Sequence, residues 1–322
     1  MPAARNLDPD TPSRPAMRYH GAKWRLAPWI LAHFPPPTAY DVYDESHCGS
    51  ASVLLRKARS PIEVVNDRDG DVVNFFRVLR DCPDDLIRMI ELTPFARREW
   101  EVAGEPTDDP VERARRFYLR SYGSIAGPTA QWRTGWRRQK KLARRADGTG
   151  AMTSAARVFA NVNHLHAVAA RLRGVFIEDC DALKIIRDYD GERTLHYVDP
   201  PYPTETRKAW KTTAYRHEMT DVQHRELAAV LHSCRGMVVL SGYRCELYDE
   251  LFPTPAWVSF SKSARTNGRG SAEETLWLNE AAQLALAAAR TAEEAAQRAL
   301  AAARAAEEAA RWPLLQTAAL DG

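Results

Sequence analysis

The chain has 322 residues, in which 45 Lys and Arg stand against 42 Asp and Glu, for a net charge of +3 at pH 7. This length allows one large domain, or a domain with an insertion, to bury an adequate core. A net charge so close to zero excludes a uniformly basic nucleic-acid-binding protein, so any affinity for nucleic acid must come from local clusters of charge.

Cysteine usage and hydropathy narrow the class of protein further. The five cysteines are odd in number, widely spaced and without a C-x-x-C pair, which argues against a disulfide framework or a structural zinc site. Residues 1–16 lack the apolar core of a signal peptide, and no later stretch has enough consecutive apolar residues to span a bilayer. We therefore expect a soluble, cytoplasmic protein with no membrane partner and with a disordered segment at residues 1–16.

Short apolar runs alternate with helical segments from Ala39 onward, which is the pattern of a parallel sheet covered by helices. The last two apolar runs flank a Gly-rich turn at residues 267–270 and predict an antiparallel hairpin at the end of the sheet. The predicted fold is α/β, with a doubly wound, mostly parallel sheet of seven strands. The expected strands are residues 40–43, 63–65, 175–177, 195–198, 237–240, 257–260 and 275–278.

Two parts of the chain depart from this pattern. Between Phe95 and His166 the strand signal vanishes, and the sequence becomes helical and Arg-rich over a length far beyond an ordinary connection. After Asn279 the composition shifts to alanine in a near-exact 14-residue repeat, which is intrinsically helical but poor in large apolar residues. We therefore expect one domain made of residues 17–94 and 167–279, a helical insert at 95–166, and a solvated or loosely docked helical tail at 280–322.

The tetrapeptide Asp199-Pro200-Pro201-Tyr202 directly follows the predicted strand 195–198. In open α/β sheets ligands bind beyond the carboxyl ends of strands, which is where this tetrapeptide would lie. An amine on an aromatic ring is a poor nucleophile because its lone pair is delocalised, and hydrogen-bond acceptors can localise that pair. The Asp199 carboxylate and the Pro200 carbonyl can each accept one amino hydrogen, and Tyr202 can stack on the base. An incidental Pro-rich turn is the structural alternative, which the position after an apolar strand disfavours.

This tetrapeptide is the catalytic motif of the Dam-like DNA adenine methyltransferases, and the sequence resembles that family over residues 17–279. Segment 18–23, ahead of a predicted helix at 26–33, resembles the family's N-terminal motif. The resemblance implies that Tyr19 and Lys23 contact the methyl donor, and that Asp199 lies against the donor as well as the base. Without the family, segment 18–23 would be a basic turn.

The turn at residues 44–51 resembles the family's acidic-Pro-Phe-x-Gly-x-Gly motif and precedes a predicted helix at 52–58. The resemblance implies donor contacts from Glu45 and from the backbone at Gly49, where a tight turn allows close approach. Ser46, His47 and Ala51 replace the family's Pro, Phe and last Gly. The motif is therefore a degenerate match, and a purely structural turn is the alternative.

Two further acidic residues follow predicted strands. Asp67 lies 18 residues beyond Gly49, close to the separation at which an acidic residue commonly binds ribose hydroxyls, and it matches the family's ribose-binding acid. Asp181, after the strand 175–177, holds a position where the resemblance implies contact with the donor's adenine. A turn or a helix cap is the structural alternative for an acidic residue in such a place.

The insert supplies the clustered charge that the whole chain lacks. Between Gln131 and Arg145 there are seven basic residues, no acidic ones, and the interleaved Trp132 and Trp136. Clustered cations contact phosphates, and Arg suits base edges in the major groove. A solvated basic face is the alternative, but the position between the donor and catalytic motifs favours DNA binding. The residues predicted to bind DNA are Arg133, Arg137, Arg138, Lys140, Lys141 and Arg144.

These features together predict a site-specific methyltransferase that moves a methyl group from S-adenosylmethionine to N6 of adenine in double-stranded DNA. The target base would be flipped out, because a stacked adenine cannot present its amino group to the donor. We expect a monomer, which suffices for the chemistry, and no metal, since the His47–Cys48 and His164–His166 pairs lack companion ligands. The alternatives are methylation of another planar amino group, such as cytosine N4, RNA adenine or glutamine, and a catalytically silent DNA-binding scaffold. The chemistry fits a restriction-modification system as well as a solitary methylase.

Overall fold

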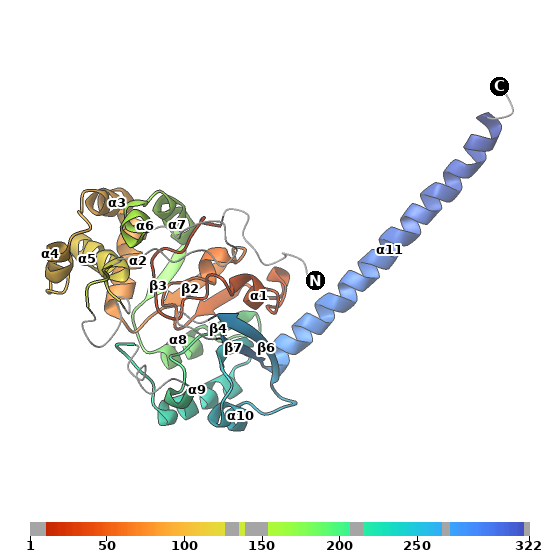
Figure 1. The fold of residues 1–322 in the computed structure, drawn as a ribbon. Coiled ribbons are helices and arrows are strands. Elements are labelled where there is room, and N and C mark those ends of the chain that lie inside the picture. The colour runs from red at the N-terminus through yellow and green to blue at the C-terminus, as the bar shows by residue number, and fades with distance from the viewer. Residues whose placement is uncertain (1–10, 126–134, 139–153, 207–214, 266–270, 319–322) are drawn as a thin grey trace.

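The computed structural model describes residues 11–125, 135–138, 154–206, 215–265 and 271–318. Its centre is a seven-stranded sheet in the order β3-β2-β1-β4-β5-β7-β6 (Figure 1). The first five strands run parallel to one another, β7 is antiparallel to β5, and β6 is antiparallel to β7. The strands are β1 Val42–Glu45, β2 Ile62–Asn66, β3 Val175–Glu178, β4 Thr194–Val198, β5 Met237–Tyr243, β6 Val258–Arg265 and β7 Ser271–Leu278. The predicted doubly wound, mostly parallel sheet with an antiparallel end hairpin is confirmed.

The strand boundaries differ from the predicted ones for two reasons. The ladder of β1 begins at Val42, because the backbone N–H groups of Asp41 and Val42 both point to the carbonyl of Arg193 at the edge of the ladder. Strand β6 continues beyond its apolar run, because its polar end pairs with β7, with Ser261 opposite Thr275. Hydrophobic runs thus located the buried centre of each strand, and the pairing partner decided where it ends.

The central strands of the sheet are buried on both faces, and the alternation of their side chains divides the core in two. On β5, Met237 and Val239 join the larger hydrophobic cluster, whereas Val238 and Leu240 join the smaller one. The larger cluster is covered by α1 (Ala27–Leu31), α2 (Gly70–Asp81), α3 (Pro83–Glu91) and helices of the insert. The smaller is covered by α8 (Ala182–Tyr189), α9 (Asp221–Ser233) and α10 (Glu246–Leu251). Helices on both faces leave the carboxyl edge of the parallel strands open for a ligand.

The helices predicted at 26–33 and 52–58 are shorter than expected. The first is reduced to α1, and the second is a turn followed by the 3₁₀ helix η2 (Leu54–Arg56). The prediction of an α-helix over 52–58 is wrong, because Ala51 has φ of 49° and the chain makes a single tight turn at that point. The N–H of Leu54, at the start of η2, donates to the Glu45 carboxylate at 3.0 Å, and the chain is extended again at Lys57. A further short 3₁₀ helix, η1 (Pro37–Ala39), precedes β1.

The insert is helical in its described part and packs against the main domain. It contains α4 (Arg97–Val102), α5 (Pro110–Gly123), α6 (Ala155–Ala160) and the beginning of α7 (His164–Leu172). Helix α5 packs on α2, where the rings of Phe75 and Tyr118 stack with centroids 6.1 Å apart. In Figure 1 these helices gather beyond the β3 edge of the sheet. Because α2 and α5 share one hydrophobic cluster, the insert is continuous with the core of the domain.

The N-terminal segment contacts this helical region. Arg14 donates hydrogen bonds to the Tyr122 hydroxyl at 3.1 Å and to the Val158 carbonyl at 2.9 Å, and Ala16 is fully buried. The prediction that residues 1–16 are disordered is therefore wrong for Arg14 and Ala16, while residues 1–10 lie outside the described part. The low hydropathy of the segment hid its contacts, because they are made by one guanidinium group and by small side chains.

The alanine-rich tail forms one helix, α11 (Glu280–Ala318), which extends away from the body (Figure 1). Its first turns dock: Ala282 is buried, Leu286 packs against the larger cluster, and Gln283 donates to the Leu278 carbonyl at 2.9 Å. Farther along, Leu300 is exposed. None of the helices in the described part of the chain combines the length and the hydropathy needed to cross a membrane.

Candidate active site

A pocket lies at the carboxyl ends of β1, β2, β3 and β4, where the turns that follow these strands meet. It holds about 1130 Å³ of empty space, part of which is open to solvent. The structure brings all the residues predicted to contact the donor to the wall of this one pocket. They are Tyr19, Lys23, Glu45, Gly49, Asp67, Asp181 and Asp199.

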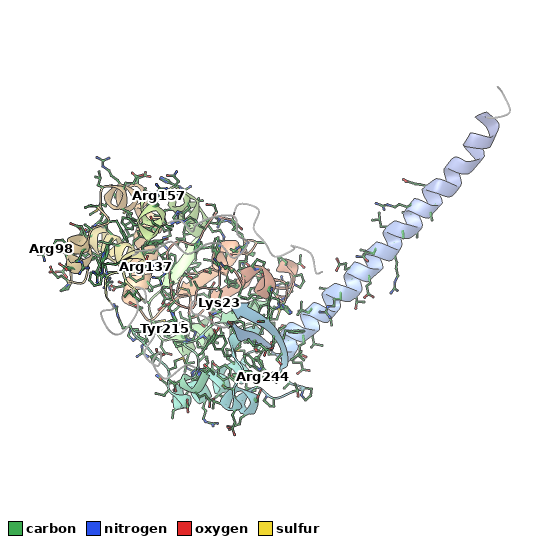
Figure 2. All side chains as sticks on the ribbon, in the orientation of Figure 1. Lys23, Arg98, Arg137, Arg157, Tyr215 and Arg244 are labelled. Carbon is green, nitrogen blue, oxygen red and sulfur yellow. The ribbon has the colours of Figure 1, made fainter. Side chains whose placement is uncertain are left out.

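The segment before α1 enters the pocket through a turn at Gly21, whose φ is +73°. A side chain at this position would collide with the Tyr215 hydroxyl, because a Cβ would lie only 2.3 Å from that oxygen. The turn directs Lys23 into the pocket, where its ammonium group donates to the Gly21 carbonyl at 3.1 Å. Figure 2 labels Lys23 and Tyr215 within the α/β body, and Arg98 at the far side of the insert.

The turn after β1 keeps its backbone shape despite its substitutions. Gly49 has φ of +49°, and a Cβ there would lie 2.8 Å from the ring of Tyr19. The N–H of Gly49 donates to Asp67 at 2.8 Å, which ties this turn to the end of β2. Ala51, at the position where the family usually has glycine, also adopts a left-handed φ of 49°. Since that conformation costs a non-glycine residue about 1–2 kcal/mol, the rest of the turn must hold Ala51 in place.

Two of the pocket carboxyls are poorly solvated. Burial raises the pKa of Glu45 to about 8. Hydrogen bonds from the Tyr43 hydroxyl and the Leu54 N–H favour the ionised form, but burial outweighs them. Burial likewise raises the pKa of Asp67 to about 6, although the N–H groups of Asp69 and Gly49 donate to its carboxylate. A cationic ligand would favour the ionised form of both groups, so the pocket gains negative charge when such a ligand enters.

Asn66 joins three of the turns that form the pocket. Its amide nitrogen donates to the carbonyls of Ser46 and Cys180, at 2.9 and 3.1 Å, and its amide oxygen accepts from the Cys180 N–H at 3.0 Å. The neighbouring Asp181 caps α8 by accepting from the Leu183 N–H at 2.9 Å, and its side chain is exposed on the pocket wall. The capping interpretation of Asp181 is thus correct in geometry, and its second carboxylate oxygen is not needed for the cap.

The tetrapeptide Asp199-Pro200-Pro201-Tyr202 lies at the end of β4, as predicted, and its aspartate is engaged on both oxygens. The ammonium group of Lys23 lies 2.8 Å from Asp199 Oδ2, and the Tyr202 hydroxyl lies 3.0 Å from Asp199 Oδ1. Burial raises the pKa of Asp199 to about 6, with Lys23 lowering it and Glu274 raising it. For Lys23, Asp199 and Glu274 outweigh the effect of burial and hold the pKa above its ordinary value.

Glu274, from β7, is a member of this cluster that the sequence analysis did not identify. It is buried, contacts the Tyr202 hydroxyl and accepts a hydrogen bond from the Ser241 hydroxyl of β5 at 2.7 Å. Its carboxylate lies 3.6 Å from the Lys23 ammonium group. The available signal was a glutamate placed close to the apolar run Leu276–Leu278, on a strand that lies between β5 and the edge strand β6.

Residues 215–219 also line the pocket and were not identified from the sequence. Arg216 fastens them to the start of α2, pairing with Asp69 at 2.8 Å and with Asp71 at 3.1 Å. Asp71 also pairs with Arg113 and Arg120 of α5. The segment that follows the catalytic motif is therefore connected through one carboxylate to the first long helix of the insert.

The predicted DNA-binding run is described only in part. Arg133, Lys140, Lys141 and Arg144 lie outside the described residues. Arg138 is exposed and Arg137 is half-buried, with its N–H donating to the Gly123 carbonyl at 2.7 Å. Trp136 packs on the rings of Phe95 and Trp100, with centroids 4.8 and 5.9 Å away, so it supports the insert. The Arg residues of α5 pair with carboxylates, as expected of a helix that packs against the body.

A separate group of possible metal ligands lies at the opposite edge of the sheet. Ligand atoms of Asp190, His196 and Cys234 lie within 4.8 Å of one another. His196 is paired with Asp44 at 2.9 Å and with Asp190 at 3.5 Å. Both Asp190 oxygens accept backbone N–H groups, from Arg235 and Gly236. Among the described residues none of these three lines the pocket, and the His196 ring is paired with carboxylates on both sides.

The sheet order, the pocket at its carboxyl edge and the tetrapeptide after β4 define an α/β methyltransferase of the Rossmann-like class. Residues 19–105 match the family model described as D12 class N6 adenine-specific DNA methyltransferase. This match confirms the resemblance to the Dam-like enzymes and indicates an adenine-specific DNA methyltransferase, which implies DNA adenine methylation. It spans the half of the pocket from Tyr19 to Asp67 and ends before the tetrapeptide. No curated protein matches the chain.

Proposed function

We propose that this protein transfers a methyl group from S-adenosylmethionine to N6 of adenine within a specific short sequence of double-stranded DNA. The observation that carries the proposal is the single pocket that joins Lys23, the Gly49 turn and Asp67 to the catalytic tetrapeptide. The family match implies DNA as the substrate class. The donor, the target atom and the sequence specificity are further parts of the proposal.

The pocket residues fit a cationic donor that carries an adenosyl group. Carboxylates outnumber Lys and Arg seven to three along the pocket wall, which favours the sulfonium and ammonium groups of the donor. We assign ribose hydroxyls to Asp67, the adenine end to Asp181, and the methionine end to Tyr19, Lys23 and Glu45. The left-handed turn at Gly49 lets a ligand approach the backbone closely, because no side chain projects there. When bound, the donor supplies an electrophilic methyl group.

The catalytic residues act on the amino group that receives the methyl. The Asp199 carboxylate and the Pro200 carbonyl each accept one amino hydrogen, which localises the nitrogen lone pair for attack. Once methylated, the nitrogen carries one proton too many, and Asp199, with a pKa of about 6, is placed to accept it. Tyr202 stacks on the target base.

DNA recognition is assigned to the insert. A flipped adenine has to enter the same carboxyl edge, so the duplex must lie across the mouth of the pocket and beside the insert. Arg137 and Arg138, with the predicted contacts Arg133, Lys140, Lys141 and Arg144, would bind phosphates and read base edges. All the assigned pocket residues come from one chain, so a monomer suffices.

The test is transfer of labelled methyl from S-adenosylmethionine to unmethylated duplex DNA of mixed sequence, followed by nucleoside analysis and mapping. Single-stranded DNA, RNA and protein serve as parallel substrates, and donor binding is measured separately by calorimetry. We expect N6-methyladenine at one short motif in the duplex only. Methylcytosine, or methyl transfer to RNA, would replace the proposed substrate. Absence of donor binding with DNA binding preserved would identify a catalytically silent scaffold.

A further inference from the structure

Any adenine amino group that reaches Asp199 has to compete with two donors, because each carboxylate oxygen already accepts one of them. Lys23 holds Oδ2 at 2.8 Å, and the Tyr202 hydroxyl holds Oδ1 at 3.0 Å. Each of these donors takes up one lone pair and part of the charge of the carboxylate, so Asp199 holds the target amino group more strongly when a donor leaves. A buried ammonium group or phenol does not leave its acceptor unless another acceptor is ready, since an unpaired buried polar group is costly.

Glu274 is the acceptor that both donors already touch. Its Oε1 atom is in hydrogen-bond contact with the Tyr202 hydroxyl and lies 3.6 Å from the Lys23 ammonium group. The single hydroxyl proton of Tyr202 can be donated to only one carboxylate at a time, so Asp199 and Glu274 compete for it. The Lys23 ammonium also lies 4.9 Å from the centre of the Tyr202 ring, so the two donors are adjacent.

We propose that Glu274 is a positioning residue that takes Lys23 and Tyr202 from Asp199 and so frees the Asp199 carboxylate to bind the target amino group. The proposal rests on the proposed function of the same site and adds the residue that prepares it. Glu274 acts through Lys23 and Tyr202 and does not touch the base.

The position of Glu274 is fixed well enough for this role. Ser241 donates to its Oε1 atom at 2.7 Å, and β5 and β7 pair directly at this point, with Thr275 opposite Gly242. Glu274 is buried, whereas its chain neighbour Glu273 is exposed. Two buried carboxylates beside one ammonium group leave one negative charge in excess, which keeps Lys23 charged whichever carboxylate it contacts.

The charged and titratable groups that face Asp199 come from several elements. Of these, Glu45 has a pKa of about 8 and is largely uncharged where Asp199 titrates, so Glu274 is the main negative neighbour. Removing its charge must therefore make Asp199 easier to ionise. The facing groups are Lys23, Glu45 of β1, Tyr197 of β4, Tyr202, Glu274 of β7 and Tyr248 of α10.

The experiment compares wild type, Glu274→Gln and the matched control Glu273→Gln. Glutamine keeps the size and the acceptor oxygen of Glu274 but removes the charge that attracts Lys23. We expect kcat to fall about tenfold or more in Glu274→Gln, with the acid limb of the pH profile lower by about one pH unit. We expect Glu273→Gln to behave as wild type, and Glu274→Asp to recover part of the lost rate.

A second measurement does not depend on methyl transfer. Carboxyl NMR of the full chain labelled with ¹³C in aspartate reports the titration of Asp199, assigned with Asp199→Asn. We expect Asp199 to titrate at lower pH in Glu274→Gln than in wild type. An unchanged titration, or an unchanged kcat, overturns the proposal. A shifted titration in a wild-type protein that methylates no DNA supports the link between Glu274 and Asp199 and contradicts the proposed function alone.

Discussion

Lys23 Nζ lies 2.8 Å from Asp199 Oδ2, so the turn before α1 and the turn after β4 meet in one ion pair. Both side chains are largely buried, which makes the pair stronger than a surface salt bridge and costly to leave half-made. The proposed donor site and the catalytic motif are therefore one electrostatic unit, although the insert separates them along the chain. A substitution that disturbs Lys23 should therefore also affect Asp199, and the reverse.

The first prediction concerns the Asp199 carboxylate. In Asp199→Asn the side chain keeps its size but loses the charge and one of its two acceptor oxygens, so the amino lone pair is less well localised. We expect kcat to fall by a factor on the order of 10²–10³, measured as labelled methyl transfer to duplex DNA. The matched control is Asp188→Asn on the exposed face of α8, which should keep full activity. A rate within a factor of two of wild type in Asp199→Asn would contradict the assigned chemistry.

The second prediction is the pH dependence of catalysis. Burial raises the pKa of Asp199 to about 6, and the carboxylate form is the one that accepts the amino hydrogens. Activity should therefore be full above that pKa and fall tenfold per pH unit below it, with a midpoint near pH 6. The measurement is kcat over pH 4.5–8, with circular dichroism at each pH to exclude unfolding. The residual activity of Asp199→Asn should lack this limb; an identical limb in the variant would assign the titration to another group.

The sequence predicted those parts of the fold and the site that depend on local pattern. Apolar runs located all seven strands, and the positions of Glu45, Asp67 and Asp199 after their strands placed them on one edge, because parallel strands end on the same side. Glu274 was not identified, because its place beside Asp199 depends on the hairpin pairing with β5. Arg216 was not identified for a related reason: its partners at the start of α2 are distant in the sequence.

Contacts between residues distant in the sequence also explain the two wrong predictions. A helix was predicted over residues 52–58, but the chain forms only the 3₁₀ helix Leu54–Arg56 and is extended again at Lys57, whose ammonium group pairs with Glu63. Residues 1–16 looked disordered because polar segments usually are, whereas Arg14 finds acceptors on α5 and α6. Long-range polar contacts leave no periodic signal in a sequence.

The third prediction tests the turn after β1. In Gly49→Ala the new methyl group would lie 2.8 Å from the Tyr19 ring, and a left-handed φ of +49° would be strained as well. We expect donor affinity to fall by about tenfold or more in calorimetry, because both the Tyr19 side chain and the turn have to move. The control is Gly174→Ala, which has a similar φ of +81° but no atom within 4 Å of the new Cβ. Gly174→Ala should lose about 1–2 kcal/mol of stability and keep its donor affinity. Equal donor affinities in the two variants would show that the turn at Gly49 is not part of the donor site.

The fourth prediction concerns a buried ion-pair network beneath β2. Arg171 donates to both oxygens of Glu63, at 2.6 and 2.8 Å, and Lys57 donates to the same carboxylate at 2.6 Å. Burial raises the pKa of Glu63, but the Arg171 hydrogen bonds and the Lys57 charge outweigh it and hold the pKa below its ordinary value. Arg171→Ala should lower the free energy of unfolding by about 3–5 kcal/mol, measured by urea denaturation. The exposed neighbour Arg173 provides the control, since Arg173→Ala should change it by no more than about 0.5 kcal/mol.

The sign of the pH effect follows from the same network. A carboxyl whose folded-state pKa is depressed contributes stability above its unfolded pKa and loses that contribution as the pH falls through the folded value. The gap between wild type and Arg171→Ala should therefore be widest near neutral pH and narrow in acid. A gap that stays constant as the pH falls would show that Arg171 stabilises the protein by packing alone.

The last prediction separates the docked and the projecting parts of α11. Ala282 and Leu286 pack against the core, and Gln283 donates to the Leu278 carbonyl, whereas Leu300 is exposed. Truncation after Thr291 keeps these contacts and should change the free energy of unfolding by no more than about 0.5 kcal/mol, with kcat unchanged. Truncation after Asn279 removes the buried methyl and methylene groups and should cost about 2 kcal/mol. Because the docked turns pack on β5, which carries Ser241, the longer truncation should also lower kcat. Full activity after the loss of Leu286 would show that the active site does not depend on this contact.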